Sequence, residues 1–371
     1  MDARAYLKPC VRTQEEVAAF LKRDWQGGYD RVNRGWTYDA ELGWVLTDSI
    51  RPDGIDGSKT FYHYEPGGCR ERIHFAEQEA RVHTYGNSFT HCDQVSDGET
   101  WQEYLAAHLQ EPLENYGVGG YSVYQAYRRM LKVEQTHPAD YIILNVWDDD
   151  NFRNLDAWRT IRFGRKAPCG YTLPHLRVNL ADDTVDEVEN LCASEDAVHR
   201  LADLEWVVAH FGEDPVLEVM LSRQEGQVEK PMSVGFGMSC DGSAGELGAL
   251  HERAALRATH FILEKAEDFV RQTHKKLFVV LSYSRRGVQA ALEGTPNWDQ
   301  ALVDFLDTRA YPYLDLRTCH LASFERFKGS PAAYLDQYYN GHYAPAGNFF
   351  FAQHLKDALV EWLDPTPLPY R

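Results

Sequence analysis

Residues 82–90 read Val-His-Thr-Tyr-Gly-Asn-Ser-Phe-Thr, so a short run of β-branched and aromatic residues meets a Gly-Asn-Ser turn. Such a run favours a strand, and Glu99–Leu109 then has the apolar spacing of an amphipathic helix. The order strand, tight turn, helix is typical of an open α/β sheet, where side chains at the carboxyl end of a strand point into the ligand-binding crevice. The sequence therefore predicts that Ser88 lies in such a crevice.

Strand and helix patterns alternate along much of the chain. Strands are predicted near residues 81–85, 113–116, 141–147, 276–283 and 313–316, and helices near 97–110, 123–132, 246–274 and 298–308. Alternation of this kind favours parallel pairing, because each connection carries a helix back across a face of the sheet. The fold class predicted is three-layer α/β/α, with a flavodoxin-like parallel sheet.

A second candidate is His342. A serine hydroxyl is a poor nucleophile until a base removes its proton, so a site at Ser88 requires a histidine from elsewhere. His342 lies in a turn rich in glycine and proline, just before the apolar helix pattern of residues 349–359. Both residues fall on connections that can share one edge of a sheet, so His342 is the candidate general base.

Three segments carry a family resemblance. Residues 86–90 with 95–101, and then residues 115–122, resemble the first two sequence blocks of the SGNH (GDSL-type) hydrolases, and His342 with Pro345 and Gly347 resembles their last block. The resemblance covers roughly residues 80–155 and 275–360. It implies that Ser88 is the nucleophile, that Gly120 lends its N–H to the oxyanion hole, and that His342 is the base.

The third block departs from the family pattern. It usually ends in Gly-x-Asn-Asp, whose asparagine donates to the oxyanion, but residues 144–154 place Asp148 or Asp149 at that position. An ionised carboxylate cannot donate a hydrogen bond. Either the aspartate is protonated, or Asn151 or a second backbone N–H donates, or the site does something other than ester hydrolysis. The predicted oxyanion hole is thus formed by Ser88 and Gly120, with Asp149 or Asn151.

The acid that orients the histidine also departs from the pattern. The family commonly has an aspartate two or three residues before the histidine, where this chain has Tyr339 and Asn340, and the nearest upstream acid is Asp336. Two arrangements therefore stay open. One is a full triad with Asp336, and the other is a serine–histidine dyad in which a backbone carbonyl, Asn340 or Asp336 steadies the ring.

Composition limits the partners, cofactors and cellular location that can be expected. The 38 basic and 56 acidic side chains leave a formal charge of −18, which argues against nucleic-acid and membrane-surface partners. The seven cysteines include no Cys-x-x-Cys pair, which favours free thiols over a disulfide frame or a zinc site. No secretion signal or apolar run of membrane-spanning length is visible, so a cytoplasmic location is expected. No cofactor or metal is expected, since the contiguous run Asp148–Asp150 is a poor cation site.

The rest of the chain is predicted to add two parts. Residues 1–78 form an accessory segment, with a helix over residues 12–25, where Val17, Phe20, Leu21 and Trp25 share one face, followed by short strands. Residues 79–371 form the catalytic domain, with an insertion at about 155–245 that includes a hairpin over residues 176–188. The insertion is expected to cover the site or to make subunit contacts in a homo-oligomer.

The predicted activity is that of a serine esterase. The resemblance implies hydrolysis of an acetyl or other short acyl ester of a carbohydrate or small metabolite through an acyl-Ser88 intermediate. The alternatives from other classes are an acyltransferase and a non-hydrolytic lyase or binding protein with the same fold.

Overall fold

The computed structural model describes residues 2–21, 35–166, 170–225 and 236–371. The chain forms two compact units. The insertion unit comprises the described residues within 1–31, 36–45 and 151–262, and the sheet unit comprises those within 32–35, 46–150 and 263–371. This grouping does not follow the expected boundary at residue 78, and the predicted domain division stays a prediction.

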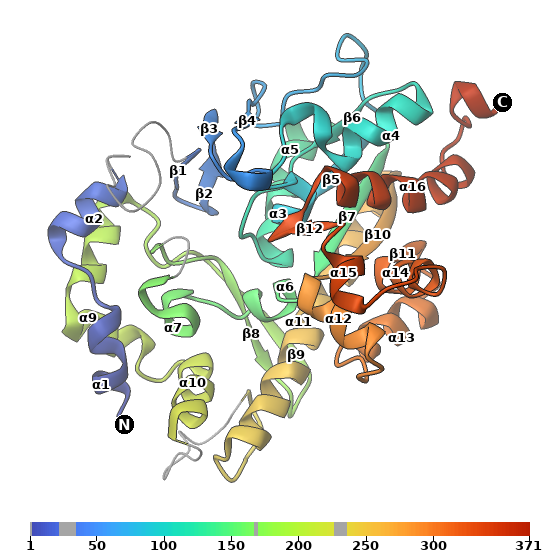
Figure 1. The fold of residues 1–371 in the computed structure, drawn as a ribbon. Helices are drawn as coiled ribbons and strands as arrows, with labels where there is room; N and C mark the ends of the chain where they lie inside the picture. The colour runs from blue at the N-terminus through green and yellow to red at the C-terminus, as the bar shows by residue number, and fades with distance from the viewer. Residues whose placement is uncertain (1, 22–34, 167–169, 226–235) are drawn as a thin grey trace. The chain divides into compact units, whose positions relative to one another are not determined.

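The centre of the sheet unit is a five-stranded parallel sheet (Figure 1). Its strands are β5 (Val82–Tyr85), β6 (Leu113–Asn115), β7 (Tyr141–Trp147), β10 (Lys276–Ser282) and β11 (Tyr313–Asp315). Their spatial order is β11-β10-β7-β5-β6, and the pairs along the sheet are parallel. Counted along the chain, this is the order 2-1-3-4-5 of flavodoxin-like folds. The predicted fold class is confirmed.

Side chains of β5 show why the sheet is covered on both faces. Successive residues of a strand point to opposite faces. Thr84 accepts a hydrogen bond from Gln102 of α4 (Trp101–Leu109), whereas its neighbour His83 bonds to Glu134 of α5 (Val123–Thr136). Helices α4 and α5 therefore lie on opposite faces, which gives the three layers.

The closing helix α16 (Pro345–Trp362) packs on α4, where the rings of Phe351 and Trp101 stack with centroids 4.5 Å apart. The helix begins four residues earlier than its apolar pattern indicated, because Pro345 occupies its first turn without loss of a helical hydrogen bond. The other helices of this unit are α3 (Ser88–His91), α12 (Arg285–Leu292), α13 (Gln300–Thr308), α14 (Leu316–Phe324) and α15 (Pro331–Leu335).

Two small antiparallel pairs complete the sheet unit. Strand β3 (Ser49–Arg51) pairs with β4 (Thr60–Tyr62), and β12 (Tyr339–Asn340) pairs with β13 (His342–Tyr343). The second pair was not predicted. It is a tight hairpin in which Gly341 has φ +83°, a left-handed conformation that glycine adopts without steric cost.

The insertion unit is mainly helical. Its helices are α1 (Ala3–Leu7), α2 (Gln14–Leu21), α7 (Thr160–Phe163), α8 (Glu195–Val198), α9 (Leu204–Phe211) and α10 (Pro215–Glu225), and α6 (Asp150–Arg153) and α11 (Ala244–Gln272) extend across its boundaries. Strands β8 (His175–Asn179) and β9 (Thr184–Val188) form the predicted hairpin, and β1 (Trp36–Asp39) pairs with β2 (Gly43–Leu46). In α2, Val17 is buried. Trp25, which was predicted to share its helical face, lies outside the described residues.

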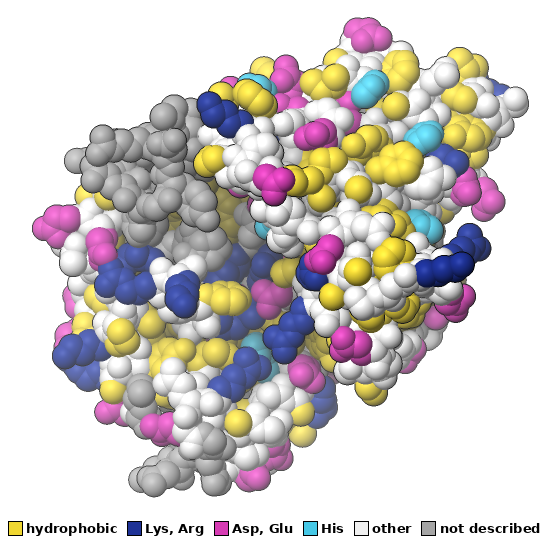
Figure 2. Space-filling view, in the orientation of Figure 1, with side chains coloured by type: hydrophobic (Ala, Val, Ile, Leu, Met, Phe, Trp, Pro, Cys, Tyr) yellow, Lys and Arg dark blue, Asp and Glu magenta, His cyan; other side chains and the backbone are white. Residues whose placement is uncertain are grey.

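Three features of the described residues concern the surface charge, the cysteines and the length of the helices. On the face seen in Figure 2, acidic and basic side chains are interspersed among hydrophobic and uncharged ones. The six cysteines within the described residues are free thiols, as predicted. Among the described residues, no helix combines the length and apolar character needed to cross a lipid bilayer.

Candidate active site

Ser88 is the first residue of α3, the one-turn helix that follows β5. Asn87 caps this helix by accepting a hydrogen bond from the Phe89 N–H at 2.8 Å. The preceding Gly86 is required by space, since a Cβ there would lie 2.1 Å from the hydroxyl oxygen of Thr90. The turn places Ser88 at the carboxyl end of β5, with only 5% of its surface exposed.

His342 lies beside Ser88. Its Nε2 is 2.8 Å from the Ser88 hydroxyl oxygen, although 254 positions separate the two residues in the chain. The hairpin β12–β13 carries His342 to this position, and the ring of Phe89 packs against the imidazole with centroids 5.1 Å apart. The structure thus brings together the two residues that the sequence singled out as nucleophile and base.

Gln94 holds the other side of the imidazole. Its Oε1 lies 2.9 Å from Nδ1 of His342 and accepts the backbone N–H of the same residue at 2.7 Å. The amide nitrogen of Gln94 in turn donates to the carbonyl oxygen of Asp53 at 3.1 Å. An uncharged amide therefore occupies the position at which a catalytic triad has a carboxylate.

Asp336 is one of the groups left open as the partner of the imidazole, and its role there stays a prediction. Its carboxylate forms an ion pair with Arg285, and 66% of the Asp336 side chain is exposed. Asn340, the other side chain considered, pairs with His342 across the two-residue strands of the hairpin. Sequence reasoning missed Gln94, because neither its type nor its spacing from Ser88 belongs to a recognisable motif.

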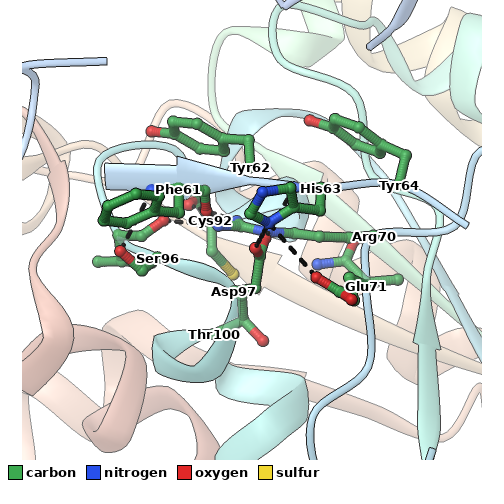
Figure 3. A network of polar contacts seen from close by, with 12 residues as sticks. Phe61, Tyr62, His63, Tyr64, Arg70, Glu71, Cys92, Ser96, Asp97 and Thr100 are labelled. Atoms are coloured by element: carbon green, nitrogen blue, oxygen red, sulfur yellow. Dashed lines mark hydrogen bonds and ion pairs between the residues drawn. The ribbon is translucent and has the colours of Figure 1, made fainter. Parts of the chain in front are cut away.

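Buried Arg70 shapes the loop that carries Gln94. Figure 3 shows Arg70 beside Cys92 and Asp97. Its guanidinium donates to the carbonyl oxygens of His91, Cys92 and Val95, the last at 2.6 Å. Its Nε also donates to Asp97 at 2.8 Å, and this pair is almost fully buried. One side chain thus ties together three carbonyl groups on either side of Gln94.

The hydrogen bonds from Arg70 stabilise a loop whose backbone conformation is uncommon. Cys92 and Gln94 have φ values of +64° and +73°, a region in which residues other than glycine are uncommon. The N–H of Gln94 donates to the Tyr62 hydroxyl at 2.8 Å. Figure 3 also shows His63 above Asp97, with 2.8 Å between its Nδ1 and the carboxylate. The surrounding hydrogen bonds thus hold a conformation that the loop residues themselves disfavour.

Buried His91 and half-buried Asp93 form a polar pair within the same loop. His91 Nδ1 bonds to the Asp93 carboxylate, and the Tyr64 hydroxyl lies 2.6 Å from His91 Nε2. Burial lowers the pKa of His91 to about 4, so the ring is neutral and accepts from Tyr64. Burial opposes ionisation of Asp93, but the electrostatic attraction and the hydrogen bond of His91, with smaller attractions to His342 and Arg51, hold its pKa well below the usual range.

The loop Gly117–Gly120 packs against α3. A Cβ at Gly117 would lie 2.2 Å from the backbone nitrogen of His91, so only glycine allows this approach. Val118 donates its N–H to the Gly86 carbonyl oxygen at 3.0 Å, which joins the loop to the turn before Ser88. Gly120 has φ +83°. These contacts bring the second block of the family resemblance to the nucleophile turn, and the oxyanion role of Gly120 stays a prediction.

The aspartates after β7 support the frame of the site. Asp150 accepts from the Asn87 side chain at 2.9 Å, and Asp148 accepts from the Ser284 hydroxyl at 2.8 Å. Burial raises the pKa of Asp148 to about 6, although the hydrogen bonds from Ser284 oppose the shift. Asp149 is half-buried, and its N–H donates to Asp148. Its role at the oxyanion stays a prediction.

Asn151, the other predicted oxyanion donor, belongs to the insertion unit. Its side-chain oxygen accepts a hydrogen bond from the Thr259 hydroxyl at 2.6 Å, and the residue is buried. Its proposed contribution to the oxyanion hole also stays a prediction.

Comparisons with known proteins give only distant similarities. No protein-family model and no curated protein sequence matches the chain. Among solved structures, it is similar to the acetyl xylan esterase AlAXEase, with TM-score 0.39, 12% identity and coverage of 76% of this chain and 100% of that one. An acetylxylan esterase from Geobacillus stearothermophilus gives TM-score 0.36, 10% identity, and coverage of 76% and 95%. A putative lipolytic protein of the G-D-S-L family from Desulfitobacterium hafniense gives TM-score 0.35, 10% identity, and coverage of 75% and 98%.

Proposed function

We propose that the chain is a serine esterase of the SGNH type, which hydrolyses an acyl ester through a covalent intermediate on Ser88. The observation that carries the proposal is the 2.8 Å distance between the Ser88 hydroxyl oxygen and Nε2 of His342. A base within hydrogen-bond reach is what a serine needs to become a nucleophile. The pair lies at the carboxyl end of a parallel strand, where folds of this class bind their ligands.

The contacts of Gln94 determine which nitrogen of His342 is free to act. The backbone N–H of His342 is a donor, so the Gln94 atom 2.7 Å from it is the amide oxygen. That same oxygen faces Nδ1, which must therefore carry the proton. Nε2 is left with a lone pair directed at the Ser88 hydroxyl, the tautomer required of a general base.

The reaction follows in two steps of the same kind. Ser88 Oγ bonds to the ester carbonyl carbon while its proton passes to Nε2 of His342. The tetrahedral intermediate then collapses, and the alcohol leaves with the proton from Nε2. Water repeats the sequence on the acyl-serine and releases the acid. The N–H groups of Ser88 and Gly120 are proposed to stabilise the oxyanion, since they belong to adjoining turns at the strand end.

The positive charge that develops on His342 is balanced in an unusual way. Gln94 offers a dipole and no charge, and the charge of His342 is one of the smaller causes that lower the pKa of Asp93. We assign Gln94 the positioning of the ring and Asp93 the stabilisation of the imidazolium. The two functions that one aspartate performs in a catalytic triad are then divided between two neighbouring residues.

The proposed substrate is an acetyl or short acyl ester of a carbohydrate or small metabolite, as the sequence resemblance implies. A fluorophosphonate probe tests the nucleophile directly: the folded protein should be labelled at Ser88, and the Ser88→Ala variant should not. Hydrolysis of p-nitrophenyl acetate and of acetylated sugars should depend on the same residue. Absence of labelling in folded protein would refute the proposal, and ester products formed only with an added alcohol would point to acyl transfer instead.

A further inference from the structure

A second group of polar side chains lies on the α5 face of the sheet, apart from the residues assigned to the esterase. His83 of β5 and Glu114 of β6 are in-register neighbours, so their side chains lie on the same face. Nε2 of His83 and Nε2 of His137 each lie 3.0 Å from the same carboxylate oxygen of Glu114. Among His83, Glu114 and His137, one potential ligand atom from each lies within 4.8 Å of the other two.

The imidazole of His83 is held by a second carboxylate. Its Nδ1 lies 2.8 Å from Oε1 of Glu134. Glu134 is itself held by the Tyr85 hydroxyl at 2.8 Å, the Ala139 N–H at 2.9 Å and Lys275 at 3.0 Å. A carboxylate behind a histidine, which sets its tautomer and orientation, is typical of metal-binding histidines.

Within the described residues, the inner nitrogen of His83 has an ion-pair contact with Glu114 and no hydrogen bond of good geometry. The side chain is fully buried, and within the described part of the chain its Nε2 has no hydrogen-bond partner. The 3.0 Å approach to Glu114 is an ion-pair distance without the angle of a hydrogen bond. A buried nitrogen of this kind is costly unless something else engages it.

We propose that His83, Glu114 and His137 bind a divalent cation of the zinc type. Two imidazoles and one carboxylate form a ligand set that zinc accepts, with a fourth position left for water or another ligand. Neighbouring ligand atoms about 3 Å apart suit a central ion at the usual zinc distances of about 2.0–2.2 Å. This inference departs from the expectation that the chain holds no metal, because ligands at positions 83, 114 and 137 form no short motif.

A pocket supplies the route to the site. It has a volume of about 310 Å³, and its lining includes Glu114 and His137, together with Glu65, Cys69 and Arg72. The side chain of His137 is 58% exposed, so a cation can enter from the solvent side while His83 closes the buried side. An entry path, and side chains that orient the ligands as Glu134 orients His83, are features expected of a metal site.

The competing explanation is a metal-free ion-pair network. Arg72 lies 3.3 Å from Glu114, and a protonated His83 could balance the remaining charge. The network also includes the Tyr116 hydroxyl, which donates to Glu114 at 2.7 Å, and His137 Nε2, which lies 3.1 Å from the second carboxylate oxygen. It leaves the poor angle at His83 Nε2 unexplained, and a cation would account for that angle. The other candidate group, His63 with Glu71 and Asp97, is weaker because buried Arg70 already pairs with Asp97 at 2.8 Å.

The test is zinc binding to the whole chain. Protein stripped with a chelator is titrated with Zn²⁺ by calorimetry, and bound metal is counted after dialysis. One Zn²⁺ per chain is expected. His137→Ala should weaken zinc affinity at least about tenfold, because the loss of a residue that only hydrogen-bonds to a metal ligand already costs that much. His108→Ala is the matched control, because His108 is a half-buried histidine of α4 outside the cluster. It should bind as the parent does.

Several results would overturn the proposal. They are the absence of stoichiometric binding, equal weakening by His137→Ala and His108→Ala, and a preference for Mg²⁺ or Ca²⁺ over Zn²⁺. Glu114→Gln provides a second variant that keeps the side-chain volume, and circular dichroism checks that each variant is folded. Fluorophosphonate labelling of Ser88 should be equal in the stripped and loaded protein, so failure of the metal proposal can be told apart from failure of the esterase proposal.

Discussion

The side-chain oxygen of Gln94 contacts both Nδ1 and the backbone N–H of His342, at 2.9 and 2.7 Å. One uncharged atom therefore holds the main chain and the ring of the candidate base. In the proposed mechanism this arrangement separates orientation of the imidazole from charge, which a triad aspartate combines, and substitution can test the separation.

Replacement of Gln94 by alanine should remove the acceptor of Nδ1–H. We expect kcat on p-nitrophenyl acetate to fall by about 10²–10⁴-fold, approaching the loss seen when a triad histidine is held in the wrong tautomer. Gln94→Glu places a carboxylate beside the imidazole, which favours its protonated form. The acid limb of the kcat profile should then move to higher pH. An unchanged profile for Gln94→Glu and full activity for Gln94→Ala would contradict the positioning role.

Asp336→Asn should leave kcat/KM within about twofold of the parent. Its exposed ion pair with Arg285 is of a kind that contributes about 0–1 kcal/mol to stability. Steady-state kinetics and urea unfolding measure both quantities. A large loss of activity would restore Asp336 as the acid of a triad.

Ser88→Ala should lower kcat/KM by at least about 10⁴-fold, because the covalent step is lost. Loss of the hydrogen bond to His342 should change the free energy of unfolding by only about 1 kcal/mol. Kinetics with p-nitrophenyl acetate and thermal unfolding of the same preparation separate the two effects. Residual hydrolysis near the parental rate would place the nucleophile elsewhere.

Arg70→Met should destabilise the fold by about 3–5 kcal/mol, because it leaves Asp97 buried without its cation and frees the carbonyl groups of the Gln94 loop. Urea unfolding measures the loss. Arg285→Gln is the matched control, since it breaks an exposed pair and should cost less than about 1 kcal/mol. Similar losses of unfolding free energy in both variants would show that the buried Arg70–Asp97 pair contributes no more to stability than an exposed pair.

The stability of the protein should fall on the acid side partly because of His320. Burial, with the nearby His354, lowers the pKa of His320 in the folded state to about 3, whereas the unfolded value is about 6.5. Between these values the unfolded chain binds more protons, so stability is lost as pH falls below about 6.5. One such group contributes at most about 1.4 kcal/mol per pH unit.

The His320→Gln variant isolates this contribution. The hydroxyls of Tyr334 and Tyr343 lie 3.1 and 3.2 Å from the His320 ring, so the variant is expected to be less stable throughout. Its free energy of unfolding should nevertheless depend less steeply on pH between 6.5 and 4 than that of the parent. Parallel pH curves for the two proteins would show that His320 takes up its proton equally in both states.

The central strands were predictable because their apolar runs are long enough to identify. Residues 141–147 and 276–282 form β7 and β10 as predicted, and the strand that leads to Ser88 was located within a residue. The short helices α12, α14 and α15 were not predicted. Leu316, assigned to a strand, instead begins α14, because the side chain of Asp315 accepts from the Arg317 N–H at 2.8 Å and caps the helix.

The site was predictable where a residue type carries the chemistry. Ser88 and His342 could be chosen because their residue types and the turns around them are typical of a nucleophile and a base. The Ser88 hydroxyl oxygen lies 2.8 Å from His342 Nε2. Gln94 was not predictable, since its position depends on positive φ angles at Cys92 and at Gln94 itself and on hydrogen bonds from a buried arginine. Such loop conformations arise from distant contacts and leave no local pattern of residues.

Strand β5 positions one residue of each proposed site. His83 lies within the strand, and Ser88 lies five positions later, in the turn after its end. Its side chains alternate between the two faces, so a shift of one residue in its pairing would turn His83 toward α4 and displace the serine turn at the same time. A single-residue insertion or deletion in this strand should therefore abolish esterase activity and zinc binding together. The two proposed functions therefore depend on the same register of β5.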